Sequence, residues 1–435
     1  MGYTENGYMP DMMKSSQVVR PLKCACLLVC LLSIVISGCS AKLNKARNAF
    51  YNGQIDEASG ALSSRDDVAT RDQLLFYMEK GLILHHAGDY QGSIDLLLNA
   101  TALMQEQEVI SAGQQTASMV TSEWLTDYKG EYAERLLVHT YLMMNFLILG
   151  DHESALVEAK QALVVYDTYP EACSADYFTR ALIAHCYESL NEINGAYIEY
   201  KKLAELMPDP VPVARKLCVL GNRLGFYDEV EYYQQFLPEP ELNGNVDSGA
   251  GELIVFVSQG KSPVKIPHNI VLPPSIRFSF STYENRSGYI TPPAVGPVSG
   301  AGSSDIVTSD IGEVLKASLN ERLVQVIAKE TARVVVKEAI AHNIDDDNVE
   351  TLVRIAFFLM EVPDTRCWET LPAYLTMIRV PLLPGENQIH VNGMDINAAL
   401  PQIDANPGNG PFYHYSSIRN GTGPRHSKEN SQSAD

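Results

Sequence analysis

The sequence predicts an α+β protein in which an N-terminal all-α helical repeat precedes a smaller α+β domain. Three observations support this prediction. A short turn pattern recurs between apolar, helix-forming segments, a segment with Pro and Gly at 238–251 then interrupts the chain, and strand-like alternation follows it. The chain has 435 residues, of which 46% are hydrophobic, so it is long enough to build two domains.

The recurring turn has the form Gly-x-(Tyr/Ile)-x-x-Ala. Its copies begin at Gly53, Gly88, Gly150, Asn191 and Gly225, at separations of 35, 62, 41 and 34 residues. A period near 34 residues with this turn is typical of tetratricopeptide repeats (TPRs). Gly or Asn permits the tight turn between two antiparallel helices. Each helix pair leaves an apolar face uncovered, so the pairs are expected to stack over residues 39–237.

The 62-residue separation is longer than one repeat and predicts an extra helix pair between residues 101 and 134. This interval carries Trp124, Tyr128 and Tyr132. The three aromatic side chains form a candidate ligand-facing cluster. The alternative is that they pack in the helical core, as aromatic side chains in helical proteins commonly do.

Beyond the predicted linker at 238–251, the pattern changes to that of an α+β domain over 252–400. Strands are expected at 253–258 and 275–283, a loop at 291–304, helices at 312–342 and 348–362, and a hairpin over 374–391 that turns at 384–385. Residues 401–435 are rich in Asn, Gly and Ser and are predicted to be disordered.

The N-terminal segment has the features of a secretory signal. Arg20 and Lys23 lie at the start of the apolar run at 24–36, which is too short to span a bilayer, since spanning needs about 20 residues. Small residues and then a cysteine follow, in the order Ser37-Gly38-Cys39. The alternatives are an ordinary signal peptide or a transmembrane anchor.

With Cys39 directly after Gly38, the segment resembles a bacterial lipoprotein signal. The resemblance implies cleavage between these two residues, removal of residues 1–38, a diacylglycerol thioether on Cys39 and acylation, for example with palmitate, of the new amino terminus. Ser40 rather than Asp implies sorting to the outer membrane, facing the periplasm, with the inner membrane as the alternative. More than one acyl chain anchors a protein stably.

Charge and cysteine content exclude several classes of function. The net charge is −20, so neither nucleic acid nor anionic lipid headgroups are expected as main partners, because both require clustered Lys and Arg. The cysteines that remain beyond the signal and Cys39 lack metal-ligand spacing and are predicted to be buried free thiols. These are Cys173, Cys186, Cys218 and Cys367.

No catalytic residue, cofactor or metal site is predicted. The segment 255–262 ends in Gly260-Lys261-Ser262, like a phosphate-binding loop, but Val255 replaces the first required Gly, and Pro263 follows where the helix should begin. A chance match is the better interpretation. His85 and His86 are adjacent and point to different faces of a helix, so they are not spaced as zinc ligands.

A local motif, Asp-x-Arg-x-Trp-x-x-Leu-Pro, begins at Asp364 and includes Arg366 and Trp368. With Arg333 and Lys337, the segment 128–135 and the signal, it resembles a family of uncharacterised bacterial TPR lipoproteins over roughly residues 30–395. The resemblance implies architecture and not activity. Physically, Asp364 and Arg366 are expected to form an ion pair with Trp368 as an apolar plug; the alternative is a peptide or glycan contact at Trp368.

The leading hypothesis is a membrane-anchored scaffold for protein–protein interactions in the bacterial cell envelope. The lipid on Cys39 would hold it on the membrane, an unidentified envelope protein would bind the concave TPR surface, and the acidic second domain would reach away. Two alternatives stay open. One is a cell-wall-acting enzyme or activator that uses the C-terminal domain, and the other is a pilotin or assembly lipoprotein of a secretion or pilus machine.

Overall fold

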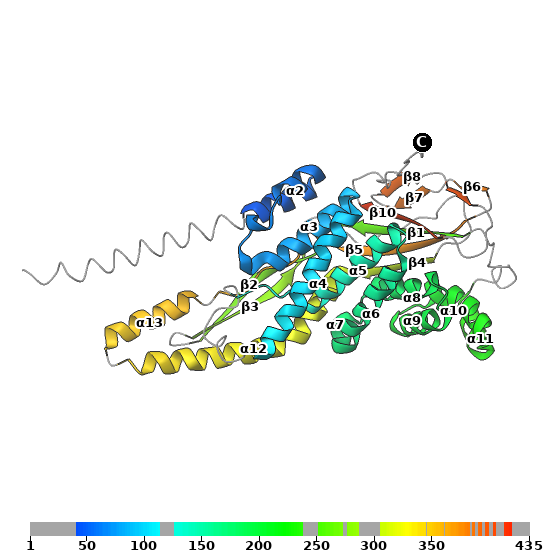
Figure 1. The fold of residues 1–435 in the computed structure, drawn as a ribbon. Coiled ribbons are helices and arrows are strands. Elements are labelled where there is room, and N and C mark those ends of the chain that lie inside the picture. Colours follow the sequence, from blue (N-terminus) through cyan, green and yellow to red (C-terminus); the bar gives the residue numbers. More distant parts are fainter. Residues whose placement is uncertain are drawn as a thin grey trace, which may run out of the picture.

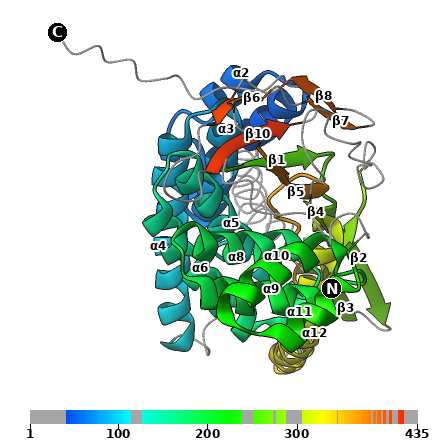
Figure 2. The same cartoon turned by 90° about the vertical axis from the view of Figure 1, so that its right-hand side faces the viewer.

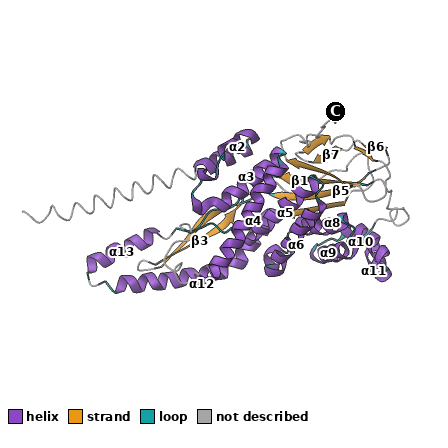
Figure 3. Ribbon diagram, in the orientation of Figure 1, coloured by secondary structure: helices purple, strands orange, loops and turns teal. Residues whose placement is uncertain are grey.

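The structure, a computed structural model, describes residues 41–113, 126–237, 251–272, 276–286, 305–344, 346–360, 362–382, 385–387, 390–393, 396–399, 403–405 and 413–419. The predicted signal with Cys39, Trp124 and the predicted loop at 291–304 therefore lie outside the described residues. Helices dominate, and strands form one small mixed sheet and three two-stranded antiparallel sheets (Figures 1 and 3). Within the described residues, no helix combines the length and apolarity that crossing a membrane requires.

The helical repeat consists of helix pairs that follow one another along the chain. The first pair is the helix over 41–51 with α2 (Ile55–Ala61), followed by α3 (Gln73–Ala87) with α4 (Tyr90–Gly113), α5 (Tyr132–Ile148) with α6 (His152–Thr168), α8 (Tyr177–Ser189) with α9 (Ile193–Leu206), and α10 (Val211–Leu224) with α11 (Tyr227–Gln234). The 3-10 turns η1 (Arg65–Asp67) and η2 (Thr70–Asp72) and the short helix α7 (Pro170–Cys173) connect them. The predicted helical repeat is confirmed.

The turns within the pairs have the backbone that the sequence pattern requires. Gly53, Gly88, Gly150 and Gly225 have φ between 77° and 82°, and Asn191 has φ 59°. Asn191 is the one non-glycine residue with positive φ in the described part of the chain. This left-handed region is disfavoured for residues with a Cβ and is best tolerated by Gly and Asn. The first position of each copy of the turn pattern is therefore set by backbone conformation.

The long separation between the second and third turns has a different cause from the one predicted. Helix α4 runs for 24 residues to Gly113, and α5 begins only at Tyr132, after the non-helical segment 126–131. The described residues thus hold no extra helix pair between 101 and 134, and the prediction is wrong there, while residues 114–125 lie outside the described chain. The elongated second helix therefore supplies part of the additional length, and the chain between Gly113 and Tyr132 supplies the rest.

The main sheet has the strand order β10-β1-β5-β4. Its strands are β1 (Glu252–Gln259), β4 (Asp305–Asp310), β5 (Tyr374–Pro381) and β10 (Tyr413–Arg419). Strand β1 pairs parallel with β10 and antiparallel with β5, which pairs antiparallel with β4. The remaining strands form the pairs β2 (Val264–Leu272) with β3 (Ile276–Glu284), β6 (Gly385–Asn387) with β9 (Ile403–Ala405), and β7 (His390–Gly393) with β8 (Ile396–Ala399).

Two predictions about this half are wrong. Residues 374–391 do not form a hairpin, because β5 pairs with β1 and β4, whereas β6 and β7 pair with β9 and β8. Strand β5 is buried on both faces except at its end, and such a strand needs a partner on each side. Residues 401–435 are not disordered throughout, because β10 lies within them and extends the sheet in parallel with β1.

Helix α12 (Ile311–His342) and α13 (Asp347–Met360) form an arm that extends away from the body, with the β2–β3 hairpin beside it (Figure 1). At 1.5 Å per residue, the 32 residues of α12 span about 48 Å. The side chain of Asp310 caps α12 by accepting a hydrogen bond from the backbone N–H of Glu313 at 3.1 Å. Both helices were predicted, and their boundaries are confirmed within two residues.

The main sheet lies against the inner face of the repeat, by which we mean the side formed by the first helices of the pairs, α3, α5, α8 and α10. These helices contact strands β10, β4 and β5, and Figure 2 shows the repeat curving around the sheet. One hydrophobic core joins both halves; within it the rings of Phe178 on α8 and Phe256 on β1 are 6.1 Å apart. The two halves therefore pack against each other, while the linker boundary at 238–251 and the expectation that the second domain reaches away from the membrane stay predictions.

Candidate functional site

The aromatic residues predicted as a ligand-facing cluster do not share one exposed surface. Tyr128 is 3% exposed, and its hydroxyl donates a hydrogen bond to Glu134. Tyr132 stacks on Tyr169 at a centroid distance of 3.5 Å with the rings 10° apart. Trp124 lies outside the described residues. The packing alternative therefore describes Tyr128 and Tyr132 better, although Tyr128 is also one of the residues that line the pocket described below.

The ion pair expected between Asp364 and Arg366 is present, with 2.7 Å between Arg366 Nη2 and Asp364 Oδ2. Burial alone would raise the pKa of Asp364, but the bonds to the Arg366 guanidinium outweigh it, and the pKa is lowered. Arg366 also bonds Asp72, which precedes α3, at 2.8 Å, and it donates to the backbone carbonyl of Thr126 at 2.9 Å. This arginine therefore joins the C-terminal half to the repeat.

Trp368, two residues after Arg366, is buried in the hydrophobic core. Its side chain is 1% exposed, its indole N–H donates to Thr370 Oγ1 at 3.0 Å, and its ring centroid is 5.9 Å from that of Tyr141. Its backbone N–H donates to Glu134 Oε1 at 2.7 Å. So little of Trp368 reaches the surface that it offers nothing for a peptide or glycan to contact, and the geometry favours the plug.

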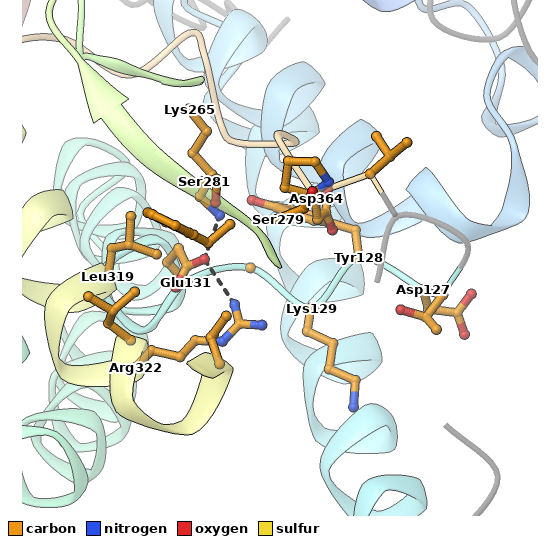
Figure 4. Close-up of a pocket in the computed structure, with 17 residues that line it drawn as sticks. Asp127, Tyr128, Lys129, Glu131, Lys265, Ser279, Ser281, Leu319, Arg322 and Asp364 are labelled. Atoms are coloured by element: carbon orange, nitrogen blue, oxygen red, sulfur yellow. Dashed lines mark hydrogen bonds and ion pairs between the residues drawn. The ribbon is translucent and has the colours of Figure 1, made fainter. Parts of the chain in front are cut away.

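A pocket of about 210 Å³ lies at the base of the arm (Figure 4). Four segments meet there: residues 126–131 before α5, the β2–β3 hairpin, α12 and residues 362–364. One part of the wall is apolar and another is charged. The apolar side chains are Phe280, Leu319, Leu323, Val326, Val362 and Pro363, and the charged ones are Asp127, Lys129, Glu131, Lys265, Arg322 and Asp364.

Glu131 is the central charge of this pocket. Its side chain is 1% exposed, and Oε1 accepts from Lys265 of β2 and, at 2.9 Å, from Arg322 of α12 (Figure 4). Burial would raise the pKa of Glu131, but the two cations outweigh burial and lower it. Glu131 is therefore a paired carboxylate and not a proton donor near neutral pH. It ties the arm, the β2–β3 hairpin and α5 together.

Glu134, one turn into α5, lies behind the pocket and is fully buried. Besides the Trp368 N–H, its carboxylate accepts from the Tyr128 hydroxyl and from the Glu131 N–H. Burial raises its pKa. All three bonds position neighbouring segments, so the arrangement can hold the arm and the motif in place, and it presents no activated base to a substrate.

A second charged cluster lies between the sheet and the inner face of the repeat. Arg379 of β5 bonds Glu188 of α8 at 2.8 Å and also Glu252 of β1 and Tyr200 of α9. Lys216 of α10 bonds both Glu188, at 2.9 Å, and Glu252. The pKa of Glu188 is lowered well below its ordinary value, because the cations outweigh a strong burial effect. The sequence analysis missed this cluster, although an arginine between Ile378 and Val380 in a buried strand was a usable signal.

Further polar contacts join the sheet to the inner face of the repeat. Ser309 of β4 donates to Asp176 at 2.9 Å and accepts from the Phe178 N–H at 2.7 Å, at the start of α8. His185 lies 3.0 Å from the Tyr415 hydroxyl of β10. The surface on which a peptide partner was predicted to bind is therefore covered by the chain's own sheet.

Metal and thiol chemistry find no support in the part of the chain that the structure describes. It contains no group of three or more His, Cys, Asp or Glu side chains placed to hold a metal ion. The four cysteines are free and buried, as predicted. Burial raises the pKa of each thiol, and for Cys218 the pKa is about 11. Such thiols are poor nucleophiles.

Comparison with known proteins identifies no family. No protein-family model and no curated protein matches the chain. Solved structures with some likeness include MamA from Desulfovibrio magneticus RS-1, with 14% identity over 46% of this chain and 90% of MamA at a TM-score of 0.32. The apo form of RapI shows 13% identity over 43% of this chain and 49% of RapI at a TM-score of 0.34. Values this low assign neither a function nor a partner.

Proposed function

We propose that this chain is a lipid-anchored, non-enzymatic interaction protein of the bacterial cell envelope that contacts a protein partner through the arm formed by α12 and α13. The observation that carries the proposal is the orientation of α13. Among its described side chains, Arg354 reaches α12, whereas the apolar Val349, Leu352 and Ile355 are exposed to solvent, unlike the apolar residues of an ordinary surface helix.

Ion pairs hold α13 in this orientation. Arg354 lies in the middle of α13 and bonds Glu338 of α12 and Glu350 one turn earlier. The exposed side carries Val349, Leu352 and Ile355, which are 46%, 61% and 51% exposed. They recur every three residues and so lie along one stripe of the helix.

An exposed apolar stripe rimmed by charged residues is typical of an interaction surface. Burying a Val, Leu or Ile side chain stabilises a complex by roughly 1.5–3 kcal/mol relative to leaving it in water. Three such side chains on one helix are enough to anchor a partner, provided that the partner covers them together. The inner face of the repeat is covered by the sheet and cannot bind a partner in this way. The proposed partner surface is therefore the arm and not the concave surface.

The anchor in this proposal is the predicted lipid on Cys39. The structure describes a helix from Ala41 onward, two residues after Cys39. Two residues span about 7 Å at most. The repeat would therefore be held close to the membrane surface.

The Cys39→Ser variant tests the anchor. The wild-type chain is expected in the membrane fraction, with a mature amino terminus at residue 39 and a mass increase from acylation. The variant is expected to lose both the lipid and the membrane association. An unmodified Cys39 in a membrane-bound, uncleaved wild-type chain would contradict the anchor and favour a transmembrane segment.

Site-specific photo-crosslinking in intact cells tests the arm. A photoreactive residue at Leu352 is expected to give a discrete crosslinked protein, and the same residue at Val157, which is 56% exposed on α6, is expected to give none. Adding Ile355→Glu to the Leu352 probe should abolish the product without changing thermal stability, because Ile355 is exposed. Equal products at both sites, or a product that survives Ile355→Glu, would contradict docking through α13.

The cell-wall enzyme considered as an alternative needs a carboxylate poised to exchange protons. Glu131 and Asp364 in the pocket have lowered pKa values, because each is paired with a cation. Neither carboxylate of this pocket therefore supports the enzyme alternative.

A further inference from the structure

A second pocket, of about 250 Å³, opens beside the carboxyl ends of the parallel strands β1 and β10. It lies between the end of the helix over 41–51, α3, and the segment that leads into β5. It is lined by Tyr51, His86, Ser258, Gly260, Lys261, Thr370, Pro372 and Arg419. None of these residues belongs to the arm or lines the pocket at its base.

Cations gather around the Tyr51 ring in this pocket. The ring centroid lies 4.7 Å from Lys261 Nζ, 4.9 Å from Arg286 Cζ and 5.6 Å from Arg419 Cζ. Arg419 also lies 3.4 Å above the Phe50 ring. These three cations come from three separate segments, so the fold brings them together rather than a local basic sequence.

Two carboxylates lie near these cations. Glu369 bonds Arg47 at 2.6 Å and lies 3.7 Å from Arg286, and Glu79 bonds Arg47 at 2.7 Å. Lys261 has no ion-pair partner in the described part of the chain. The cluster includes four cations and two carboxylates, and the pocket lining itself contains Lys261 and Arg419 and no carboxylate, in a chain whose net charge is −20. The cations are Arg47, Lys261, Arg286 and Arg419, and the carboxylates are Glu79 and Glu369.

Two further features point into the same space. Ser258 is 2% exposed, and its hydroxyl makes no hydrogen bond of normal geometry with another described residue, although the Tyr141 hydroxyl is near it. Gly260 has φ 71°, and this left-handed turn carries the chain from the end of β1 to Lys261. Burial lowers the pKa of Arg419 to about 10, so the pocket holds this cation in a largely desolvated position, where an anion gains most.

We propose that this pocket binds a phosphate group, with Lys261 as its principal charged contact, Arg419 beside it and the Ser258 hydroxyl as a hydrogen-bond donor. A phosphate oxygen accepts from lysine, arginine and hydroxyl donors in different directions, and charge-assisted bonds of this kind are the stronger ones. The segment Gly260-Lys261-Ser262 lacks the glycines and the helix of a phosphate-binding loop. The site instead depends on Lys261 meeting Arg419, which lies more than 150 residues away in the sequence.

The group has two possible sources, a soluble phosphate or phosphomonoester and a phospholipid headgroup. The probes are inorganic phosphate and dihexanoyl phosphatidylglycerol, added to the full mature chain in mild detergent and followed by titration calorimetry against chloride at equal ionic strength. Saturable phosphate binding is expected. Displacement of phosphate by the short-chain lipid would assign the headgroup as the source, and failure to displace it would assign a soluble phosphate.

Variants at Lys261 test the assignment of the residue. Lys261→Gln should weaken phosphate binding about tenfold or more, while Lys261→Arg should restore most of it, because the charge is kept. The matched control is Lys45→Gln. The Lys45 side chain is 64% exposed, and it lies on the helix over 41–51 that also carries Tyr51, but outside the pocket. Circular dichroism melts establish that each variant is folded. Absence of saturable binding by the wild-type chain, or equal binding by Lys261→Gln and Lys45→Gln, would overturn the proposal.

Discussion

At the scale of single residues, His85 couples three elements. It lies on α3, its Nδ1 is 2.6 Å from Asn145 Oδ1 on α5, and its Nε2 is 3.0 Å from Ser417 Oγ on β10. Burial lowers the pKa of His85 to about 4, since the charged imidazolium is penalised more strongly than the Asn145 bond supports it. The folded chain therefore holds this imidazole neutral at pH values where the unfolded chain protonates it.

The stability of the chain should fall as pH drops from about 6.5 to about 4. In this window the unfolded state binds the His85 proton and the folded state does not, so His85 contributes a loss of up to roughly 3 kcal/mol. Chemical unfolding at pH 7, 5.5 and 4.5 measures how the free energy of unfolding depends on pH. His85→Gln should weaken this dependence, even if the substitution also changes stability at pH 7. His342→Gln, at an exposed position on α12, is the control and should keep the slope. Identical slopes for both variants would contradict the argument.

Replacement of Trp368 separates a plug from a binding residue. Trp368→Ala should lower the free energy of unfolding by roughly 3–5 kcal/mol, because a large buried side chain is removed and the surroundings relax only partly. Tyr227→Ala, at a side chain 69% exposed at the start of α11, should change it by less than about 0.5 kcal/mol. If the Trp368→Ala chain is as stable as the wild type, the packing role is contradicted and a peptide or glycan contact at Trp368 is favoured.

At the scale of elements, the repeat turns need glycine because of its backbone conformation and not because a side chain would clash with its surroundings. Around both Gly150 and Gly60, a Cβ would meet no atom within 4 Å, yet Gly150 has φ +79° while Gly60 lies in α2 without positive φ. Gly150→Ala should therefore destabilise the chain by about 1–2 kcal/mol, and Gly60→Ala should stabilise it by about 0.5–1 kcal/mol. Thermal or urea unfolding measures both, and effects of the same sign would contradict this explanation.

Local signals made some elements predictable from sequence. The turns at Gly53 and Asn191 and the start of α12 after Asp310 each depend on residues a few positions apart, so their pattern is complete within a short window. Strand β10 was missed because its partner β1 lies more than 150 residues earlier. Its Tyr, Ser and Arg residues are also common in polar tails, and the sequence alone does not show that the strand packs against α3 and α5.

The same limit applies to the sites. The pair Asp364–Arg366 was expected because the two residues are close in the sequence, whereas the bond from Arg366 to Asp72 joins residues almost 300 positions apart. Lys261 was noticed in the sequence but set aside, because Arg419 and Tyr51 reach it only through the fold. Long-range pairing is therefore what separates the observed sites from the predicted ones.

At the scale of the whole molecule, the repeat encloses its own C-terminal half. Polar and apolar side chains on one face of the sheet meet the inner face of the repeat, and a single core runs through both. The repeat thus fixes the base of the arm through Glu131, while the apolar stripe of α13 stays exposed to solvent. This arrangement explains why a TPR-like chain would engage a partner away from its concave surface.

A double-mutant cycle between Glu188 of α8 and Arg379 of β5 tests this enclosure most directly, because the two residues belong to different halves and bond at 2.8 Å only if the sheet lies against the inner face. Glu188→Gln and Arg379→Met are each expected to destabilise the chain, with a coupling energy of at least about 1.5 kcal/mol in urea unfolding. The control cycle pairs Arg379→Met with Glu57→Gln, at an exposed residue of α2, and should be additive within about 0.5 kcal/mol. A coupling energy near zero for Glu188 and Arg379 would contradict the placement of the sheet inside the repeat.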